Sequence, residues 1–265
     1  MQQLSDEAAQ PVLRADADGI ATLTLNRPDA RNALSVGMMT ALADSLDAAG
    51  RDPAVKVVII AATGPAFCAG HDLKEVRANP GRAFYERLFR QCSDLMMGIT
   101  RLPKPVIAAV HAMATAAGCQ LVASCDLALA GRSARFATPG VNIGLFCSTP
   151  MVALSRAVGR KAAMEMLLTG EAIDAEKAVG LGLINRVVDD TDLMTEAGTM
   201  AATIASKSPL TLKVGKEAFY RQAEMDLADA YDYTSGVMVR NMMADDATEG
   251  IDAFLNKRRP NWSGT

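Results

Sequence analysis

The sequence predicts an α/β protein with a largely parallel sheet. Two short runs, Lys56–Ala62 and Pro105–Val110, are continuously apolar and rich in β-branched residues, which is typical of strands buried on both faces. A helix is expected between them, around Phe84–Met97, and a third strand at Asp126–Ala130. Strands that alternate with helices at this spacing favour a parallel sheet.

The N-terminal part of the chain predicts a hairpin followed by a helix. Val12–Ala15 and Ile20–Leu25 are β-prone, and the Asp18-Gly19 step between them suits a tight turn. Ser35 is expected to cap a helix that continues to about residue 49, because apolar residues recur on one face of that segment.

From about Met151 the pattern is helical almost throughout. The pattern is interrupted by a short strand expected at Leu183–Val188. A new helix is expected to begin at Ser208-Pro209, with proline in its first turn. The last long helix is expected at Leu227–Met243. We therefore expect an α/β core over residues 1–200 and a C-terminal helical region over 201–265.

Composition excludes several classes of protein. The net charge is −3, and no dense basic patch with interleaved aromatic residues predicts nucleic-acid binding. No apolar run approaches the roughly 20 residues that span a bilayer, so no membrane partner is expected. The polar, acidic N-terminus lacks the features of a targeting segment, which predicts a cytoplasmic protein. Five dispersed cysteines and two distant histidines predict neither a disulfide framework nor a metal site.

Several segments, in this order, resemble landmarks of the crotonase (enoyl-CoA hydratase/isomerase) family. The resemblance covers nearly the whole chain, and six segments in the right order are far more specific than any one alone. The matching segments are LNRPDARNAL (Leu25–Leu34), FCAGHDLKE (Phe67–Glu75), the run Lys104–Ala130 that contains AAGCQL, ARFATPGVNIGL (Ala134–Leu145), Val158–Val188 and EGIDAFLNKRRPNW (Glu249–Trp262).

The resemblance implies a crotonase-like spiral of β-β-α units, with a C-terminal helical region through which relatives form trimers or paired trimers. It also implies an acyl-CoA ligand whose carbonyl oxygen is held by two backbone N–H groups. In this sequence those groups fall on His71 and Ala117. Small residues around Ala117 would let the backbone approach the ligand, and a helix start would favour negative charge there.

Other residues are expected to hold CoA, which enters as part of the substrate, so no separate cofactor is expected. Arg27 and Arg31 are candidates for its phosphates. In the family, the closing segment reaches the CoA bound to a neighbouring subunit. The resemblance therefore implies a homotrimer or hexamer. The remaining candidates for CoA contact are Ala69, His71, Asp72, Leu73, Phe254 and Lys257.

The sequence departs from the family at the two glutamates that hydratases use for proton transfer. The matching positions are Gln120, in GCQL, and Gly140, in TPG. An amide does not accept a proton near neutral pH, and glycine has no side chain. Each general acid or base typically contributes about 10²–10⁴-fold in rate. A drop of several powers of ten in the rate of hydration is therefore expected.

Few residues are candidates to replace the glutamates. Asn142, Cys147 and Ser148 follow the second lost position, and Glu86 lies on the helix after the second segment. A free cysteine is more often a small buried hydrophobic residue, and a charge on an amphipathic helix is usually solvated. The His71 side chain could act as an acid or base, or simply contact the adenine or the surface.

The sequence therefore predicts an acyl-CoA-binding member of the enoyl-CoA hydratase/isomerase family. It leaves three activities open. The first is a hydratase or isomerase with a non-standard set of residues, and the second is a catalytically silent acyl-CoA-binding protein. The third is a thioester hydrolase that uses a water held near Gln120.

Overall fold

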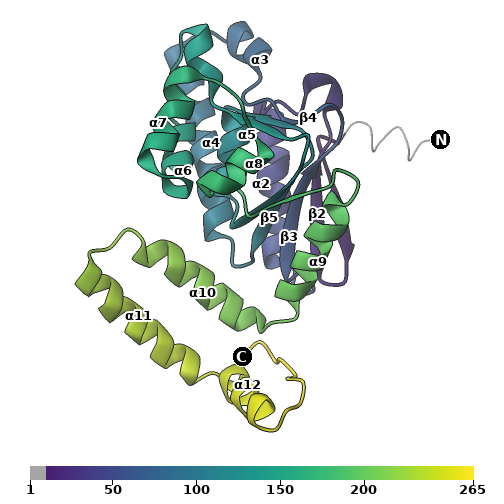
Figure 1. Cartoon of the computed structure of the whole chain (residues 1–265), viewed down its shortest axis with the longest axis vertical. Helices are drawn as coiled ribbons and strands as arrows, with labels where there is room; N and C mark the ends of the chain where they lie inside the picture. Colours follow the sequence, from purple (N-terminus) through teal and green to yellow (C-terminus); the bar gives the residue numbers. More distant parts are fainter. Residues whose placement is uncertain (1–9) are drawn as a thin grey trace, which may run out of the picture.

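The N-terminal hairpin forms as predicted. In the computed structural model, which describes residues 10–265 (Figure 1), β1 (Val12–Ala17) pairs antiparallel with β2 (Ile20–Leu25). Asp18 and Gly19 have φ angles of 51° and 78°, and two positive φ values are what a two-residue type I′ turn requires. Residues 1–9, part of the polar segment behind the cytoplasmic prediction, lie outside the described residues.

The main sheet contains the three predicted core strands. Its order is β1-β2-β3-β5-β7-β10, and every neighbouring pair beyond the hairpin is parallel. The strands added to the hairpin are β3 (Val57–Ala62), β5 (Val106–Val110), β7 (Leu127–Gly131) and β10 (Arg186–Val188).

A second, smaller sheet lies beside the first, and the sequence analysis did not foresee it. Its strands are two or three residues long and run in the order β4-β6-β8-β9: β4 (Ala66–Cys68), β6 (Met113–Thr115), β8 (Arg135–Ala137) and β9 (Ile173–Asp174). Each repeat gives one strand to each sheet before its helix, as β3-β4, β5-β6 and β7-β8 do. The expected spiral of β-β-α units is confirmed.

Helices cover both faces of the main sheet because its strands alternate their side chains between two cores. On one side, Val58 and Ile60 pack with α2 (Val36–Arg51) and α4 (Arg82–Arg101). On the other, Val57 and Ile59 pack with the alanine-rich α9 (Leu193–Ala205). The predicted cap of α2 is present, since Ser35 Oγ accepts a hydrogen bond from Met38 N at 3.1 Å.

The remaining core helices are short and follow the strands. The second unit ends in α5 (Ala117–Ser124). The others are η1 (Pro28–Ala30), α3 (Leu73–Ala78), η2 (Pro139–Ile143), α6 (Pro150–Ala157), α7 (Arg160–Thr169) and α8 (Ala175–Leu181).

The C-terminal helices stand apart from the two sheets in Figure 1. They are α10 (Pro209–Gln222), α11 (Leu227–Met242) and α12 (Asp245–Leu255), and α10 and α11 lie side by side as a helical hairpin. Residue 200 lies within α9, so the chain leaves the sheet only after Ala205. The division of the chain at residue 200 stays a prediction.

A buried ion pair joins α10 to the sheet. Lys216 Nζ lies 2.6 Å from Asp126 Oδ2 at the start of β7, and Tyr220 donates to Asp126 Oδ1 at 2.8 Å. Lys216 Nζ also donates to the backbone carbonyls of Ile99 and Lys104. This network fixes α10 opposite the end of α4.

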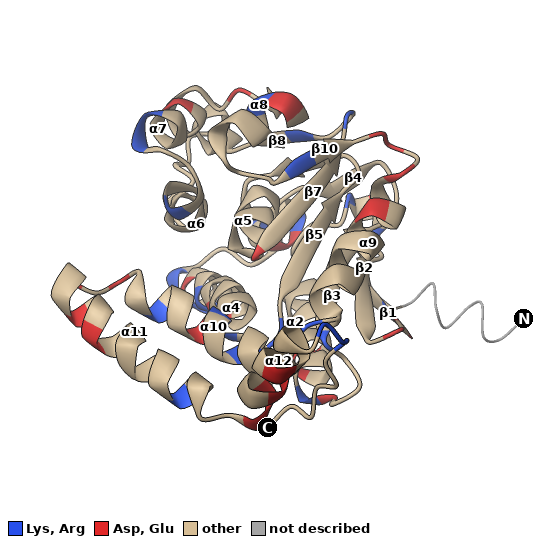
Figure 2. Cartoon of the chain, turned by 60° about the horizontal axis from the view of Figure 1, so that its bottom comes forward, with Lys and Arg blue, Asp and Glu red and all other residues tan. Residues whose placement is uncertain are grey.

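Charged residues of both signs are interspersed over the chain, as Figure 2 shows for α10–α12 and the core helices. Within residues 10–265, no helix combines the length and apolar character needed to cross a membrane.

Candidate functional site

The sequence-predicted site residues follow three parallel strands of the small sheet. The chain continues from β4 into Ala69–His71, from β6 into Ala116-Ala117, and from β8 into Thr138–Gly140. Because parallel strands end at the same edge of a sheet, the structure brings these three segments together.

Backbone hydrogen bonds join the segment Leu25–Leu34 to the segment Phe67–Glu75. Ala69 N donates to Arg31 O at 3.0 Å, Leu34 N donates to Gly70 O at 2.7 Å, and Asp72 N donates to Leu34 O at 3.3 Å. The buried Asn32 side chain fixes the loop further by donating to the carbonyl of Thr63, which precedes β4, and to that of Ala66, the first residue of β4.

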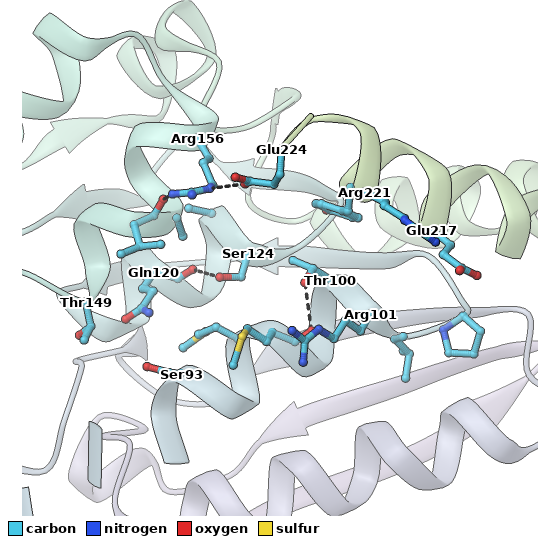
Figure 3. A pocket seen from close by; sticks show the side chains of 18 of the residues that line it. Ser93, Thr100, Arg101, Gln120, Ser124, Thr149, Arg156, Glu217, Arg221 and Glu224 are labelled. Carbon is cyan, nitrogen blue, oxygen red and sulfur yellow. Dashed lines mark hydrogen bonds and ion pairs between the residues drawn. The ribbon is translucent and has the colours of Figure 1, made fainter. Parts of the chain in front are cut away.

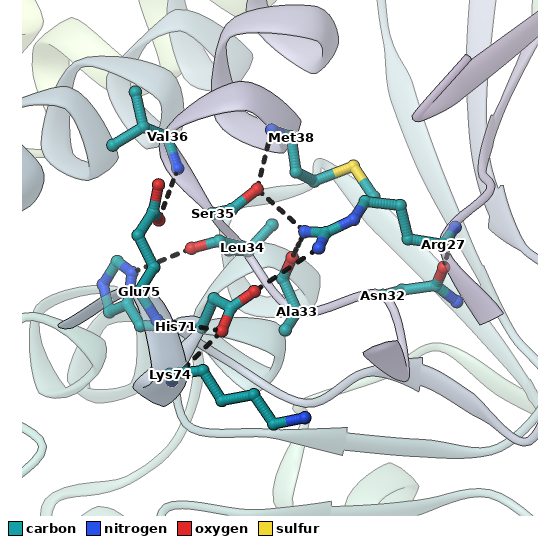
Figure 4. Close-up of polar contacts among 11 residues, drawn as sticks. Arg27, Asn32, Ala33, Leu34, Ser35, Val36, Met38, His71, Lys74 and Glu75 are labelled. Carbon is teal, nitrogen blue, oxygen red and sulfur yellow. Dashed lines mark hydrogen bonds and ion pairs between the residues drawn. The ribbon is translucent and has the colours of Figure 1, made fainter. Parts of the chain in front are cut away.

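Arg27 contacts neighbouring residues of the chain, and its role toward a phosphate stays a prediction. Its guanidinium donates to Ser35 Oγ at 2.8 Å and to the carbonyl of Ala33, and it lies 3.4 Å from Asp72 Oδ2 (Figure 4). Asp72 in turn caps α3, because its Oδ1 accepts from Lys74 N at 3.1 Å. Arg27 and Asp72 therefore stabilise the loop that carries His71.

The start of α5 packs closely against the segment Phe67–Glu75. A methyl group on Gly70, whose φ is +84°, would lie 3.0 Å from Thr115 O and 3.2 Å from Ala117 N. A methyl group on Gly118 would lie only 2.1 Å from Cys68 O. Only glycine allows these two backbones to approach so closely. Ala116, which precedes α5, takes the unusual angles φ 52° and ψ −118°.

The backbone N–H groups of His71 and Ala117 have no acceptor among the described residues. Ala117 is the first residue of α5, where N–H groups have no partner within the helix. Such donors, together with the helix dipole, attract negative charge.

The His71 side chain is largely buried. Its Nδ1 lies 3.4 Å from Leu34 O, and its ring and that of Phe89 on α4 are nearly perpendicular, with centroids 5.5 Å apart. Its Nε2 is buried with no hydrogen-bond partner among the described residues. Burial lowers the pKa of His71, against the opposing effects of the Leu34 carbonyl and Glu75, so the ring is neutral near neutral pH.

Gln120 lies one turn into α5 and lines a cavity of about 830 Å³ between α4, α5, α6 and α10 (Figure 3). The residue is 4% exposed, and its side-chain Oε1 lies 3.9 Å from Cys92 Sγ. Met96, Met97 and Val152 supply apolar wall, whereas the α10 side bears charged residues. Arg156 and Glu224 form an ion pair across it at 3.1 Å.

Gly140 is enclosed by the loop that follows it. A methyl group there would lie 2.8 Å from Leu145 O and 2.9 Å from Cys147 Sγ. Gly140 N donates to Cys147 Sγ at 3.3 Å. Burial raises the pKa of the Cys147 thiol, so the cysteine is not an activated nucleophile.

The other replacement candidates lie outside the buried site. Glu86 is 61% exposed on its side chain and pairs with Arg82 at 2.6 Å. Asn142 and Ser148 are exposed on the loop around η2. Among the described residues, no three His, Cys, Asp or Glu side chains gather as ligands for a metal ion.

Several CoA candidates are exposed. Arg31 and Leu73 lie at the surface near the second segment. Phe254 is 83% exposed on α12, and Lys257 follows that helix with a positive φ of 52°. In the chain, Phe254 and Lys257 are on the separate C-terminal region and not at the strand ends.

Sequence reasoning missed the cavity wall that α10 supplies. Lys213, Glu217, Tyr220 and Arg221 line it, although they follow Gln120 by about a hundred residues. Their i, i+4 spacing places them on one face of a helix, but the sequence holds no signal for what that face opposes.

Comparison with known proteins places the chain in a family. The model of the family described as enoyl-CoA hydratase/isomerase matches residues 15–265. The crystal structure of an enoyl-CoA hydratase from Mycobacterium smegmatis is 56% identical, with a TM-score of 0.93, and the match covers 95% of this chain and 98% of that one. The structure of human enoyl-coenzyme A hydratase domain-containing protein 3 is 49% identical, with a TM-score of 0.92, over 95% and 100% of the two chains.

The relatives also correct one prediction. Enoyl-CoA hydratase domain-containing protein 3 of Rattus norvegicus is 50% identical over 93% of this chain and 82% of its own length. This protein and four others of the same name, at 44–50% identity, are all named mitochondrial, so the cytoplasmic prediction is wrong.

The family model, the identities and the shared fold agree, and the chain belongs to the enoyl-CoA hydratase/isomerase, or crotonase, family.

Proposed function

We propose that the protein binds an acyl-CoA thioester and polarises its carbonyl between the backbone N–H groups of His71 and Ala117. One observation carries this proposal. Two donors without an acceptor in the described chain meet where Gly70 packs against the start of α5. Donors fixed in this way stabilise negative charge on the thioester oxygen, and each typically contributes about 10²–10³-fold in rate.

The acyl group would enter the cavity that begins at Gln120. Its apolar wall suits an alkyl chain, since burial of each methylene contributes roughly 0.8 kcal/mol. Gln120 could hold a water or the acyl group by hydrogen bonds, but its amide does not take up a proton. With Gly140 in the second position, hydration by the usual pair of glutamates is not available to this chain.

For the CoA moiety, Arg31 is the better phosphate candidate of the two early arginines. It is exposed, whereas Arg27 is engaged with Asp72 and Ser35. Phe254 and Lys257 would serve the CoA of a neighbouring subunit, in line with their exposure on the C-terminal region.

We also propose a homotrimer or hexamer formed through α10–α12. Exposed apolar side chains are unusually dense on these helices, and such patches favour burial against another protein surface. The side chains concerned are Phe219, Leu227, Tyr231, Met238, Val239, Met243, Ile251, Phe254 and Leu255.

The test removes one N–H donor without removing the helix. Proline is well tolerated at the first position of a helix, so Ala117→Pro deletes the donor, whereas Ala117→Gly retains it. The probe is cinnamoyl-CoA, whose absorption moves to longer wavelength when its carbonyl is polarised. Binding is measured by calorimetry and the absorption shift by difference spectroscopy, with melting temperatures as a check on folding.

We expect the wild-type protein and Ala117→Gly to bind the thioester with a red shift, and Ala117→Pro to lose most of the shift. Wild-type protein that binds CoA thioesters no better than CoA itself would contradict the carbonyl contact. Steady turnover of crotonyl-CoA would favour the enzyme over the silent binding protein, and release of free CoA would favour the hydrolase.

A further inference from the structure

The cavity that begins at Gln120 extends along α4 toward the end of that helix. Cys92, whose Sγ lies 3.9 Å from Gln120 Oε1, precedes Ser93, and the lining of the cavity continues from Ser93 to Arg101. An α-helix rises about 1.5 Å per residue, so Ser93 and Arg101 are roughly 12 Å apart along α4. In Figure 3, Gln120 lies toward the left of the cavity and Arg101 toward the right.

Helix α10 supplies a charged wall on the side opposite α4. Lys213, Glu217 and Arg221 follow one another at four-residue spacing and share one face of α10, and all three line the cavity. Glu217 lies on the same side of the cavity as Arg101 in Figure 3. These four side chains are on residues that are also exposed, so the cavity is open to solvent at this end.

The lining of the cavity carries an excess of positive charge. Basic side chains outnumber acidic ones by four to two, which gives a net charge of +2 in a chain whose net charge is −3. Arg156 and Glu224 form an ion pair at 3.1 Å and compensate each other. Three basic side chains then remain, with Glu217 as the one acidic side chain against them.

Two of these three basic side chains have no partner in the chain. The guanidinium of Arg221 lies over the ring of Tyr233 on α11, 4.5 Å from its centroid. Arg101 and Lys213, in contrast, have no side-chain hydrogen bond or ion pair among residues 10–265. Cations that line a partly enclosed space concentrate the field there and attract an anion.

The far end of the acyl group is the part of the ligand that would reach these cations. The thioester carbonyl is proposed to lie at Ala117, at the start of α5, and the acyl chain would extend from it along Met96 toward the end of α4. A carboxylate at the tip of that chain would meet Arg101 and Lys213, which form charge-assisted hydrogen bonds with carboxylates. An alkyl tip would instead displace water from these charges and offer them no partner.

We propose that the site takes acyl-CoA thioesters whose acyl group ends in a carboxylate, and that Arg101 and Lys213 select this end. The inference rests on the proposed binding of an acyl thioester and specifies the class of acyl group. The methylenes pack on the apolar part of the wall, and the carboxylate lies at the open end of the cavity. There it keeps part of its hydration, so the cost of burying its charge is small.

The experiment compares two ligands that differ only at the tip of the acyl group. Suberoyl-CoA, the monothioester, has a carboxylate where octanoyl-CoA has a methyl group. Dissociation constants are measured by calorimetry, and the preference is the dissociation constant of octanoyl-CoA divided by that of suberoyl-CoA. Contacts with the CoA moiety are common to both ligands and cancel in this ratio.

The variants change charge at the end of the cavity. Arg101→Gln and Lys213→Gln remove the two cations, and Glu217→Gln removes the acidic side chain between them and Arg221. Arg90→Gln on α4 and Lys207→Gln before α10 are the matched controls, because both residues are exposed and neither lines the cavity.

We expect the wild-type protein to bind suberoyl-CoA at least as tightly as octanoyl-CoA. Arg101→Gln and Lys213→Gln should each lower the preference about 2–5-fold, the range typical of one exposed ion pair, with octanoyl-CoA bound as in wild type. Glu217→Gln should raise the preference, which a merely structural defect would not produce. The controls should leave it unchanged, and added salt should lower it in the wild-type protein because exposed charges are screened.

Two results would overturn the inference and leave the proposed function standing. One is wild-type protein that binds octanoyl-CoA more tightly than suberoyl-CoA. The other is equal weakening of both ligands in Arg101→Gln and Lys213→Gln, which would assign these cations to the phosphates of CoA. Wild-type protein that binds neither thioester would remove the proposed function itself, and this inference with it.

Discussion

The sulfur of Cys147 accepts a hydrogen bond from the backbone N–H of Gly140 at 3.3 Å and occupies the space into which a side chain at residue 140 would extend. A side chain at residue 140 would therefore meet the loop itself. The loop after η2 has closed over the position, so that neither the carbonyl of Leu145 nor the Cys147 thiol leaves room for a Cβ.

This packing predicts that Gly140→Glu destabilises the protein and does not create a hydratase. The new Cβ would lie 2.8 Å from a backbone oxygen, and overpacking of this kind typically costs about 1–3 kcal/mol. Chemical unfolding and crotonyl-CoA turnover are the measurements. Gly180→Glu is the control, because residue 180 is exposed on α8 with nothing within 4 Å of a new Cβ. A fully stable, active Gly140→Glu protein would show that the loop opens freely.

Ala116→Gly is expected to leave stability unchanged or to increase it. Ala116 has a φ of 52° and a ψ of −118°, a conformation that costs an L-residue of order 1–3 kcal/mol. Glycine relieves that strain, against a backbone entropy cost of about 0.5–1 kcal/mol. Urea unfolding measures the free energy of unfolding of Ala116→Gly and of the control Ala123→Gly, within α5. The control is expected to be less stable than wild type by about 1 kcal/mol. Equal losses in both variants would argue against strain at Ala116.

Asp126→Asn is expected to loosen α10 from the core. The change removes the charge that compensates Lys216, whose side chain is only 6% exposed, and breaking a buried pair typically costs about 3–5 kcal/mol. Burial lowers the pKa of Lys216, so part of the loss is relieved by deprotonation. In the double variant Asp126→Asn with Lys216→Met no charge is left unpaired. Its unfolding free energy should lie closer to wild type, and equal losses in the single and double variants would contradict the pairing.

The C-terminal tail is expected to detach at acid pH. Burial alone would raise the pKa of Asp246, but hydrogen bonds from Ser208, Ser263 and Gly264 lower it below its ordinary value. The carboxylate therefore contributes stability that is present above its unfolded pKa and is lost as pH falls through its lower, folded pKa.

Trp262, the one tryptophan of the chain, reports on this attachment because its Nε1 donates to Ser206 O at 2.8 Å. Asp246→Asn should shift the Trp262 emission toward that of an exposed indole already at neutral pH. The neighbouring Asp245→Asn, at an exposed position, should not. An emission spectrum unaffected by acid and by Asp246→Asn would contradict the role of the carboxylate.

Strands and caps were predictable where they rest on local chemistry. Ile20–Leu25 forms the predicted strand, and Ser35 and Ser208 cap the predicted helices through their hydroxyl groups. The strands of the small sheet were missed because two or three residues are too short to show an alternating pattern. Their formation depends on neighbouring strands far along the chain.

The site was predictable where it depends on the identity of residues within one short segment. The segments around His71 and Ala117 could be found from their residues, and so could the absence of carboxylates at Gln120 and Gly140. Arg27 was assigned to a phosphate, but the sequence holds no sign of its contact with Asp72, forty-five residues away.

By itself, the sequence determined the family, the order of the core strands of the main sheet and the identity of the groups at the strand ends. Each of these depends on residue type and on spacing along a short segment. The tertiary structure alone decided that Cys147 fills the space beside Gly140, that His71 Nε2 is buried without a partner among residues 10–265, and that α10 forms a wall of the cavity. These outcomes depend on burial and close contact between segments distant in the chain, which fix both the pKa values and the available space.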